Sequence, residues 1–183
     1  MMLMPATPLH YFPAYIIHKM SRFNLNFPAL IVGSIVPDLE VPMIFLISGG
    51  EIDRLILHSI LGSITLGLLI SIFISFLLYP RFVGYVLPYC REELKSKCTI
   101  SESLIISGLI GVLGHVLLDA FHHEYNPLIY PFSAESINDF VLFGDYLLAS
   151  NLVSSLLIIF GLMMIFREIR VGRDGFWKRI LVG

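Results

Sequence analysis

Charged residues are scarce in this chain, and their scarcity excludes an ordinary water-soluble domain. They make up 14% of the 183 residues, whereas hydrophobic residues make up 56%. Soluble domains carry about 25% charged residues. A single core of this size cannot bury so much apolar surface away from water. A lipid bilayer can solvate the surplus, so the composition predicts one integral membrane domain over residues 1–183 with the bilayer as its partner.

Excess basic charge and cysteine are also lacking. The net charge of −2 provides no basic surface, so no nucleic-acid partner is expected. The two cysteines, Cys90 and Cys98, lie eight positions apart in a charged segment, which matches neither a zinc site nor a redox pair. We expect them to be free thiols. A Gly-x-Ser-x-Gly nucleophile motif is missing as well, which disfavours a serine hydrolase.

Long apolar runs are what the chain does contain. A membrane-spanning helix needs about 20 mostly apolar residues, and four segments meet this length: about 27–48, 59–79, 100–121 and 146–166. A fifth, 9–20, is too short to span and is expected to be a half-spanning or interfacial helix. The predicted fold is therefore all-α, a polytopic transmembrane bundle of four spanning helices and a short N-terminal helix. Pro28 is expected in an early helical turn, and Pro80 is expected to end the segment 59–79.

The distribution of Lys and Arg predicts an orientation in the cell membrane. Four of these residues lie in the loop 80–99 and five in the tail 167–183, whereas the loop 122–145 has none. The positive-inside rule then predicts that the loop 80–99 and the basic tail 167–183 are cytoplasmic. Lys19 and Arg22 are expected on the same side.

Two stripes of small residues predict where helices touch. One recurs every four residues on the segment 59–79, and its members are Ser59, Ser63, Gly67, Ser71 and Ser75. The segment 100–121 and the residues just after it have Ser107, Gly111, His115, Asp119 and His123 at the same interval. Small side chains allow close helix approach in membranes, so His115 and Asp119 are expected to point into the bundle.

Ionisable side chains in these apolar segments need a partner or a role, because each costs roughly 2.5–3.5 kcal/mol at the bilayer centre on insertion scales. They fall in four blocks: Thr7-Pro8-Leu9-His10, Pro37-Asp38-Leu39-Glu40, His58-Ser59 and His115-x-x-x-Asp119-x-x-His122-His123. On a helix, the members of the last block share one face. The predicted topology also brings His58 to the same depth as Asp119.

Imidazole and carboxylate groups together suit a divalent metal, with zinc expected first and manganese or iron as alternatives. The predicted ligands are His10, Asp38, His58, His115, Asp119, His122 and His123. They exceed one tetrahedral shell, so either two ions bind or some groups only orient the ligands. A metal-bound water could then hydrolyse a substrate, with Glu40 or an unligated Asp as general base.

A purely structural interpretation of the same residues stays open. A single His between helices is usually a hydrogen-bonded structural residue, and we expect this for His18. Asp38 could pair with a neighbouring His or with Arg54, and His122 and His123 could cap a helix end.

The four blocks also resemble a known family. Pro5-Ala-Thr-Pro-Leu-His10, Pro28 through Pro37-Asp38, His58-Ser59, and Gly114-His-x-x-x-Asp119 with the following Asn-Pro and Pro131-Phe132 resemble a prokaryotic membrane family called domain of unknown function 4184. They are also similar to a neighbouring family of membrane-bound proteins classed as metal-dependent hydrolases. That family's pattern is an early His, Pro-Asp-x-Asp, His-Ser and His-x-x-x-Asp, and this chain departs from it in having Glu40 at the second Asp.

The resemblance covers about Met4 to Ser133 and implies a helical membrane fold with a divalent metal site. It places the ligands at His10, Asp38, His58, His115 and Asp119. The functional hypothesis is a metal-dependent hydrolase of a membrane-accessible phosphoester or lipid. The alternative is a non-enzymatic membrane protein whose buried His and Asp groups are structural or form a proton or ion path.

Overall fold

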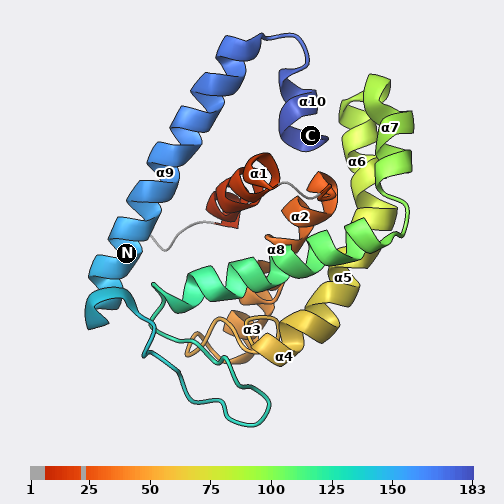
Figure 1. Ribbon diagram of the computed structural model, residues 1–183. Coiled ribbons are helices and arrows are strands. Elements are labelled where there is room, and N and C mark those ends of the chain that lie inside the picture. The colour runs from red at the N-terminus through yellow and green to blue at the C-terminus, as the bar shows by residue number, and fades with distance from the viewer. Residues whose placement is uncertain (1–6, 22–23) are drawn as a thin grey trace.

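The computed structural model describes residues 7–21 and 24–183, and these residues form helices, turns and loops without a strand. Pro5 and Ala6 of the first sequence block, and Arg22, lie outside the described residues. In chain order (Figure 1) the elements are η1 (Thr7–His10), α1 (Tyr11–Met20), α2 (Phe27–Gly33), η2 (Val36–Leu39), α3 (Val41–Ile47), α4 (Ile60–Gly62), η3 (Ser63–Gly67), α5 (Leu68–Phe73), η4 (Ile74–Leu78), α6 (Tyr79–Val86), η5 (Pro88–Cys90), α7 (Arg91–Lys97), α8 (Glu102–Ala120), η6 (Leu142–Gly144), α9 (Tyr146–Val171) and α10 (Phe176–Leu181).

The predicted all-α membrane fold is confirmed. Three helices are long and apolar enough to cross a membrane: the continuous run Ile60–Val86, α8 and α9. The segments Phe27–Gly33 and Val36–Ile47 together pass the same test, but they are bent by 43° at a short break. The predicted span 27–48 is thus a broken helix, and Pro37 and Asp38 lie directly after the break.

Local capping explains several helix boundaries. Asn26 accepts a hydrogen bond from the Ala29 amide at 3.1 Å, and Pro28 occupies the first turn of α2, as predicted. Ser101 caps α8 through the Leu104 amide, and Glu102 lies in its first turn. Side-chain oxygens at the N-cap satisfy amides that have no partner within the helix. The cap of α8 therefore fixes where the helix that carries His115 and Asp119 begins.

Pro80 does not end the helix of the segment 59–79, and this prediction is wrong. The helix continues through Pro80 to Val86 as α6. The π-helical turn η4 directly precedes the proline, and the Arg81 side chain donates to the Leu77 carbonyl. In membrane helices such local adjustments and side-chain donors satisfy the carbonyls that proline leaves free. The span is therefore longer than its sequence segment.

Glycines bring α2 and α8 into backbone contact. A Cβ at Gly33 would lie 2.5 Å from the Gly108 carbonyl oxygen, and a Cβ at Gly111 would lie 2.7 Å from the Leu30 carbonyl oxygen. Both distances are too short for any side chain. The predicted small-residue stripe also packs here, since Ser71 is fully buried and faces Gly108. This contact places η2, which follows α2, beside the C-terminal half of α8.

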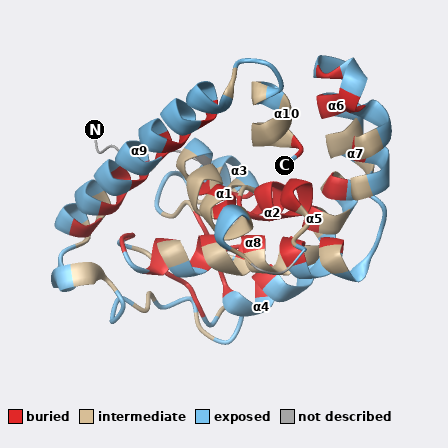
Figure 2. Cartoon of the chain, turned by 45° about the horizontal axis from the view of Figure 1, so that its top comes forward, coloured by how far each residue is buried: buried red, intermediate tan, exposed pale blue. Residues whose placement is uncertain are grey.

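Burial differs strongly between the helices (Figure 2). In the most apolar 18-residue stretch of α8, half of the residues are buried inside the protein. In the corresponding stretch of α9, a third are buried. In Figure 2, α2 is mostly red, whereas α9 is pale blue with a buried stripe along one side. The exposed side of α9 is rich in Leu, Ile and Phe. We infer that α8 is the central helix and that α9 lies at the lipid-facing edge.

The C-terminal segment folds back onto the bundle rather than forming a free tail (Figure 1). α9 runs to Val171, and α10 then returns so that the Tyr79 hydroxyl donates to the Leu181 carbonyl at 2.7 Å. Lys97 donates to the Val182 carbonyl at 2.9 Å. These contacts join the loop 80–99 to the segment 167–183, so both lie at the same end of the bundle. Their cytoplasmic location stays a prediction.

Candidate metal centre

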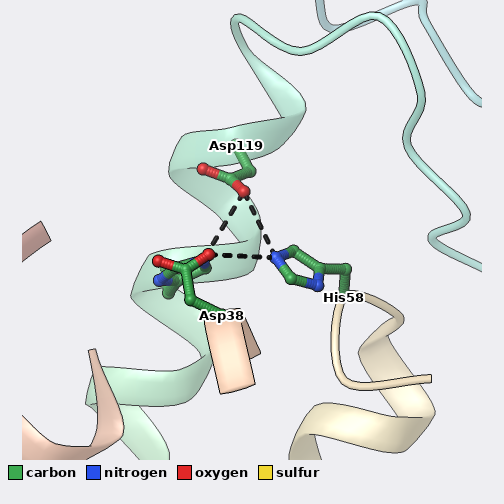
Figure 3. A group of neighbouring side chains, drawn as sticks. Asp38, His58 and Asp119 are labelled. Carbon is green, nitrogen blue, oxygen red and sulfur yellow. Dashed lines mark ion pairs between the residues drawn. The ribbon is translucent and has the colours of Figure 1, made fainter. Parts of the chain in front are cut away.

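Four sequence blocks converge on one buried cluster. Asp38 lies in η2, His58 ends the loop before α4, and His115 and Asp119 lie one turn apart on α8. His58, His115 and Asp119 are buried, and Asp38 is half-buried. Figure 3 shows Asp38, His58 and Asp119 pointing toward one another from three different segments. Because α2 packs against α8, residues far apart in the sequence meet here.

The first group of donor atoms consists of two imidazole nitrogens and two carboxylate oxygens. His115 Nε2 lies 3.4 Å from both Asp38 Oδ1 and Asp119 Oδ2. His58 Nε2 lies 3.6 Å from Asp38 Oδ1 and 3.5 Å from Asp119 Oδ2. All four donor atoms lie within 4.8 Å of one another. The group is compact enough to enclose a single ion.

In His58 and His115, Nε2 faces the cluster and Nδ1 makes a hydrogen bond on the opposite side of the ring. His115 Nδ1 lies 2.8 Å from the Ser34 carbonyl oxygen, and His58 Nδ1 lies 2.8 Å from Glu40 Oε1. Carbonyl and carboxylate oxygens only accept hydrogen bonds, so each Nδ1 carries the proton and donates. In the neutral ring the lone pair is then on Nε2, which is the arrangement of histidines that bind metals.

Glu40 holds the loop that carries His58. Its carboxylate accepts hydrogen bonds from the amides of Leu55, Ile56, Leu57 and His58 at 2.8–3.1 Å, in addition to the His58 ring. It is buried. Five hydrogen bonds engage both of its oxygens. These bonds fix the position of the loop before His58, and the general-base role of Glu40 stays a prediction.

A second group of donors meets the other oxygen of Asp119. Asp119 Oδ1 lies 3.4 Å from His10 Nε2, 3.8 Å from His122 Nε2 and 3.6 Å from His123 Nε2. The His122 Nδ1 donates to the Leu118 carbonyl at 2.7 Å. Burial lowers the pKa of His123 to about 3, and it lowers the pKa of His122 as well. Both rings are therefore neutral near pH 7, as metal binding requires.

Arg54 belongs to the cluster, although the sequence suggested only a pairing with Asp38. Its Nη1 donates to Asp119 Oδ2 at 2.8 Å, and its Nε donates to Asp53 Oδ1 at 3.0 Å. Burial opposes the charged form, but Asp119 and Asp53 outweigh it and raise the pKa of Arg54. A single Arg in the short loop before His58 was the only sequence signal for this residue.

A pocket of about 600 Å³ adjoins the cluster. Arg54 and His123 line it on the cluster side, with Asp53, Tyr125 and Phe45 among the other lining residues. Small-molecule sites have volumes of about 300–1,000 Å³. The pocket thus offers a substrate-sized space next to His123 and the Arg54 guanidinium.

The donor set fits a divalent metal. Among the described residues, the buried atoms His58 Nε2, His115 Nε2, His122 Nε2 and Asp119 Oδ1 have no hydrogen-bond partner. Leaving such atoms unpaired is costly, and here they face one another. Ligands about 2.1 Å from a tetrahedral ion are themselves about 3.4 Å apart. The observed separations of 3.4–3.6 Å in the first group match that spacing.

His18, which the sequence analysis assigned a structural role, lies outside both groups. Its ring stacks on Phe27 with 4.4 Å between ring centroids, and Gly183 lies against it. His18 is therefore a natural control for experiments on the cluster histidines.

Comparison with known proteins gives one match. The model of a family described as "Domain of unknown function (DUF4184)" matches residues 4–171. Neither a curated protein nor a solved structure matches this chain. The matched range includes every residue of the cluster.

Proposed function

The chain belongs to the family described as Domain of unknown function (DUF4184), and we propose that its buried His–Asp cluster binds divalent metal ions. The family description names no activity, so the proposal rests on the site. The observation that carries it is the convergence of unpartnered Nε2 atoms of His58 and His115 on two carboxylates. Zinc is the expected ion, because imidazole nitrogens and carboxylate oxygens at tetrahedral spacing suit it. Manganese and iron are the alternatives.

Asp119 allows two ions to bind side by side. Its Oδ2 faces the first group, His58 and His115, while its Oδ1 faces the second, His122 and His123. His10 also faces Oδ1. This arrangement supports the alternative with two ions, in which Asp119 would contribute one oxygen to each site. The expected content is two metal ions per chain.

The reaction class proposed for this site is hydrolysis of a phosphoester in a membrane-accessible substrate, such as a lipid. A bound divalent metal would supply a hydroxide near neutral pH and polarise the phosphoryl oxygen. Arg54, fixed by Asp53 and Asp119 at the pocket wall, would stabilise negative charge on the phosphoryl group. Glu40 would hold the His58 side chain in position through its hydrogen bonds to the His58 ring and to the amides of residues 55–58. The pocket of about 600 Å³ would hold the headgroup.

Metal analysis of the purified protein in detergent tests the proposal. The wild-type chain should carry zinc or manganese at up to two ions per chain. Asp119→Asn should lose both ions, while His122→Ala with His123→Ala should lose one. His18→Gln should keep the wild-type content. Cleavage of bis(p-nitrophenyl) phosphate should depend on the same ions. Metal-free wild-type protein that also takes up no zinc at micromolar concentration would refute the proposal.

A structural role is the second candidate, and the Arg54–Asp119 ion pair favours it. The guanidinium at 2.8 Å already neutralises this carboxylate, and protonated histidines could pair with the remaining charge. The cluster would then hold η2, α8 and the loop before α4 together. This candidate expects wild-type thermal stability that zinc and chelators leave unchanged. A proton or ion path is less favoured, since the donors gather around one point.

A further inference from the structure

A second pocket, of about 440 Å³, shares no residue with the metal cluster. It lies between α6 and the short basic helix α7, where the long apolar span ends. Phe76 and Leu77 line one part of it, and Arg81, Arg91 and Lys95 line another. An apolar wall thus meets three cations in one cavity.

The helix geometry explains why the cations converge. Arg91 and Lys95 are one turn apart on α7, so they share a face. The stem of Arg91 lies against Gly84 of α6, since a Cβ at Gly84 would be 3.6 Å from Arg91 Cγ. Arg81, on the same helix as Gly84, completes the cationic wall. Two separate helices therefore direct like charges into one space.

Little negative charge offsets these cations. Among the described residues, Lys95 pairs with Glu92 at 2.9 Å, an exposed pair of small energetic value. Arg81 donates to a backbone carbonyl instead of a carboxylate. The nearby acid Glu93 is engaged by Lys178 at 2.7 Å and by Lys97. The pocket therefore keeps a net positive charge that calls for an anion.

The place of the pocket relative to the apolar span identifies the anion. Phe73, Phe76 and Phe82 are exposed along the end of the span Ile60–Val86. The apolar lining of the pocket therefore continues a surface suited to acyl chains, and the cations lie at the level where headgroups begin. Basic pockets at the cytoplasmic side of membrane helices bind anionic lipid headgroups.

We propose that this pocket binds the headgroup of an anionic phospholipid. The phosphodiester pairs with Arg81, Arg91 and Lys95, and the acyl chains run along Phe76 and Leu77. The site is independent of the metal cluster and of the proposed hydrolysis. It also gives the loop 80–99 a defined contact with the membrane.

Lipid titration followed by native mass spectrometry tests this site. Phosphatidylglycerol is added to the purified protein in detergent, with phosphatidylcholine as the neutral comparison. The test variant combines Arg81→Gln, Arg91→Gln and Lys95→Gln. The control variant removes three exposed cations elsewhere, Arg167→Gln, Arg170→Gln and Arg173→Gln. Since each cation near the anionic group contributes about five-fold to affinity, the test variant should bind phosphatidylglycerol about 100-fold more weakly. The control should bind it like the wild type.

Several outcomes would overturn the proposal. Equal affinity for phosphatidylcholine would do so, as would equal loss in both variants. Displacement of phosphatidylglycerol by millimolar glycerol phosphate would identify a free-anion site instead. Phe76→Ser separates these sources further, since it should weaken lipid binding and leave glycerol phosphate binding unchanged. The thermal stability of each variant is measured in parallel. The double variant Arg91→Gln with Lys95→Gln, which keeps the Arg81 bond to the Leu77 carbonyl, should also bind phosphatidylglycerol more weakly than the wild type.

Discussion

Two buried polar clusters in this protein are built in contrasting ways. In one, Glu168 on α9 accepts hydrogen bonds from the Tyr15 hydroxyl and from Arg179 Nε at 2.6 Å. Arg179 also donates to the Glu168 carbonyl at 2.8 Å. In the other, the His–Asp cluster, several ring nitrogens face carboxylates at 3.4–3.8 Å and have no hydrogen-bond partner among the described residues.

The contrast separates a closed hydrogen-bonded network from a group of ring nitrogens and carboxylate oxygens, several of which lack such partners in the described part of the chain. Tyr15, Glu168 and Arg179 supply donors to acceptors, so the cluster closes on itself and ties α10 to α9. In the His–Asp cluster the Nδ1 atoms of His58 and His115 carry the protons. Their Nε2 atoms are therefore acceptors, and they face carboxylate oxygens that are also acceptors. A buried carboxylate lies in each cluster, Glu168 in the first and Asp119 in the second. The hydrogen bonds of the first cluster use its donors and acceptors on one another, whereas the second has a donor set that could hold a metal ion.

The largest expected effect separates the clusters by metal affinity. Asp119→Asn removes the carboxylate shared by both groups and should weaken zinc binding by more than about 100-fold, beyond the loss typical of an indirect contact. Glu168→Gln should leave zinc binding unchanged, because it touches no ligand. Isothermal titration of zinc into metal-free protein measures both. Equal losses in the two variants would remove the distinction between the clusters.

Zinc should also stabilise the wild-type protein. A ligand that binds only the folded state at 100 times its Kd stabilises by about 2.7 kcal/mol. The apparent Tm in detergent should therefore rise with zinc and fall again with a chelator. Glu168→Gln should show the same rise from a lower starting point, and Asp119→Asn should show none. A zinc response retained in Asp119→Asn would place the ion elsewhere.

Glu40→Gln should have an intermediate effect on the metal. Orienting residues behind a metal ligand typically change affinity by about 10–100-fold. We expect a loss in this range with the full number of ions still bound at saturating zinc. If Glu40 were instead a general base, the variant would bind zinc normally and lose only phosphodiester cleavage. Parallel measurement of affinity and turnover distinguishes these roles.

The smallest expected effect is on the thermal stability that the hydrogen bonds among Tyr15, Glu168 and Arg179 provide. Glu168→Gln removes a charge-assisted hydrogen bond to Arg179, and such bonds contribute about 1–2 kcal/mol at a partly exposed partner. Arg179 retains its bonds to the Asp174 and Gly172 carbonyls. The apparent Tm should fall by a few degrees without any change in metal content. A loss of metal in this variant would show that α9 and α10 influence the cluster.

Much of the framework could be predicted from local sequence. Apolar run length located the spans. The four-residue interval of small side chains located a packed face on each helix, since Ser71 of α5 faces Gly108, and Gly111 of α8 contacts Gly33 of α2. Pro28 was correctly assigned to the first turn of its helix because this preference acts within one turn. The free state of Cys90 and Cys98 was also correctly predicted.

Other features depend on contacts that local sequence does not encode. Pro80 by itself does not indicate that the π-helical turn η4 precedes α6 and that the helix continues to Val86. The bend after Gly33 lies beside a backbone contact with Gly108, a residue far away in the sequence. The Arg54–Asp119 pair joins positions 65 residues apart, and the four amides that surround Glu40 come from a loop without periodicity.

Zinc X-ray absorption spectroscopy of the loaded protein tests the central claim most directly. The account predicts a first shell of imidazole nitrogens and carboxylate oxygens at about 2.0–2.1 Å in the wild type. The histidine contribution should fall in His115→Ala and remain unchanged in His18→Gln. A shell of water oxygens alone, or a spectrum that His115→Ala leaves unchanged, would contradict it.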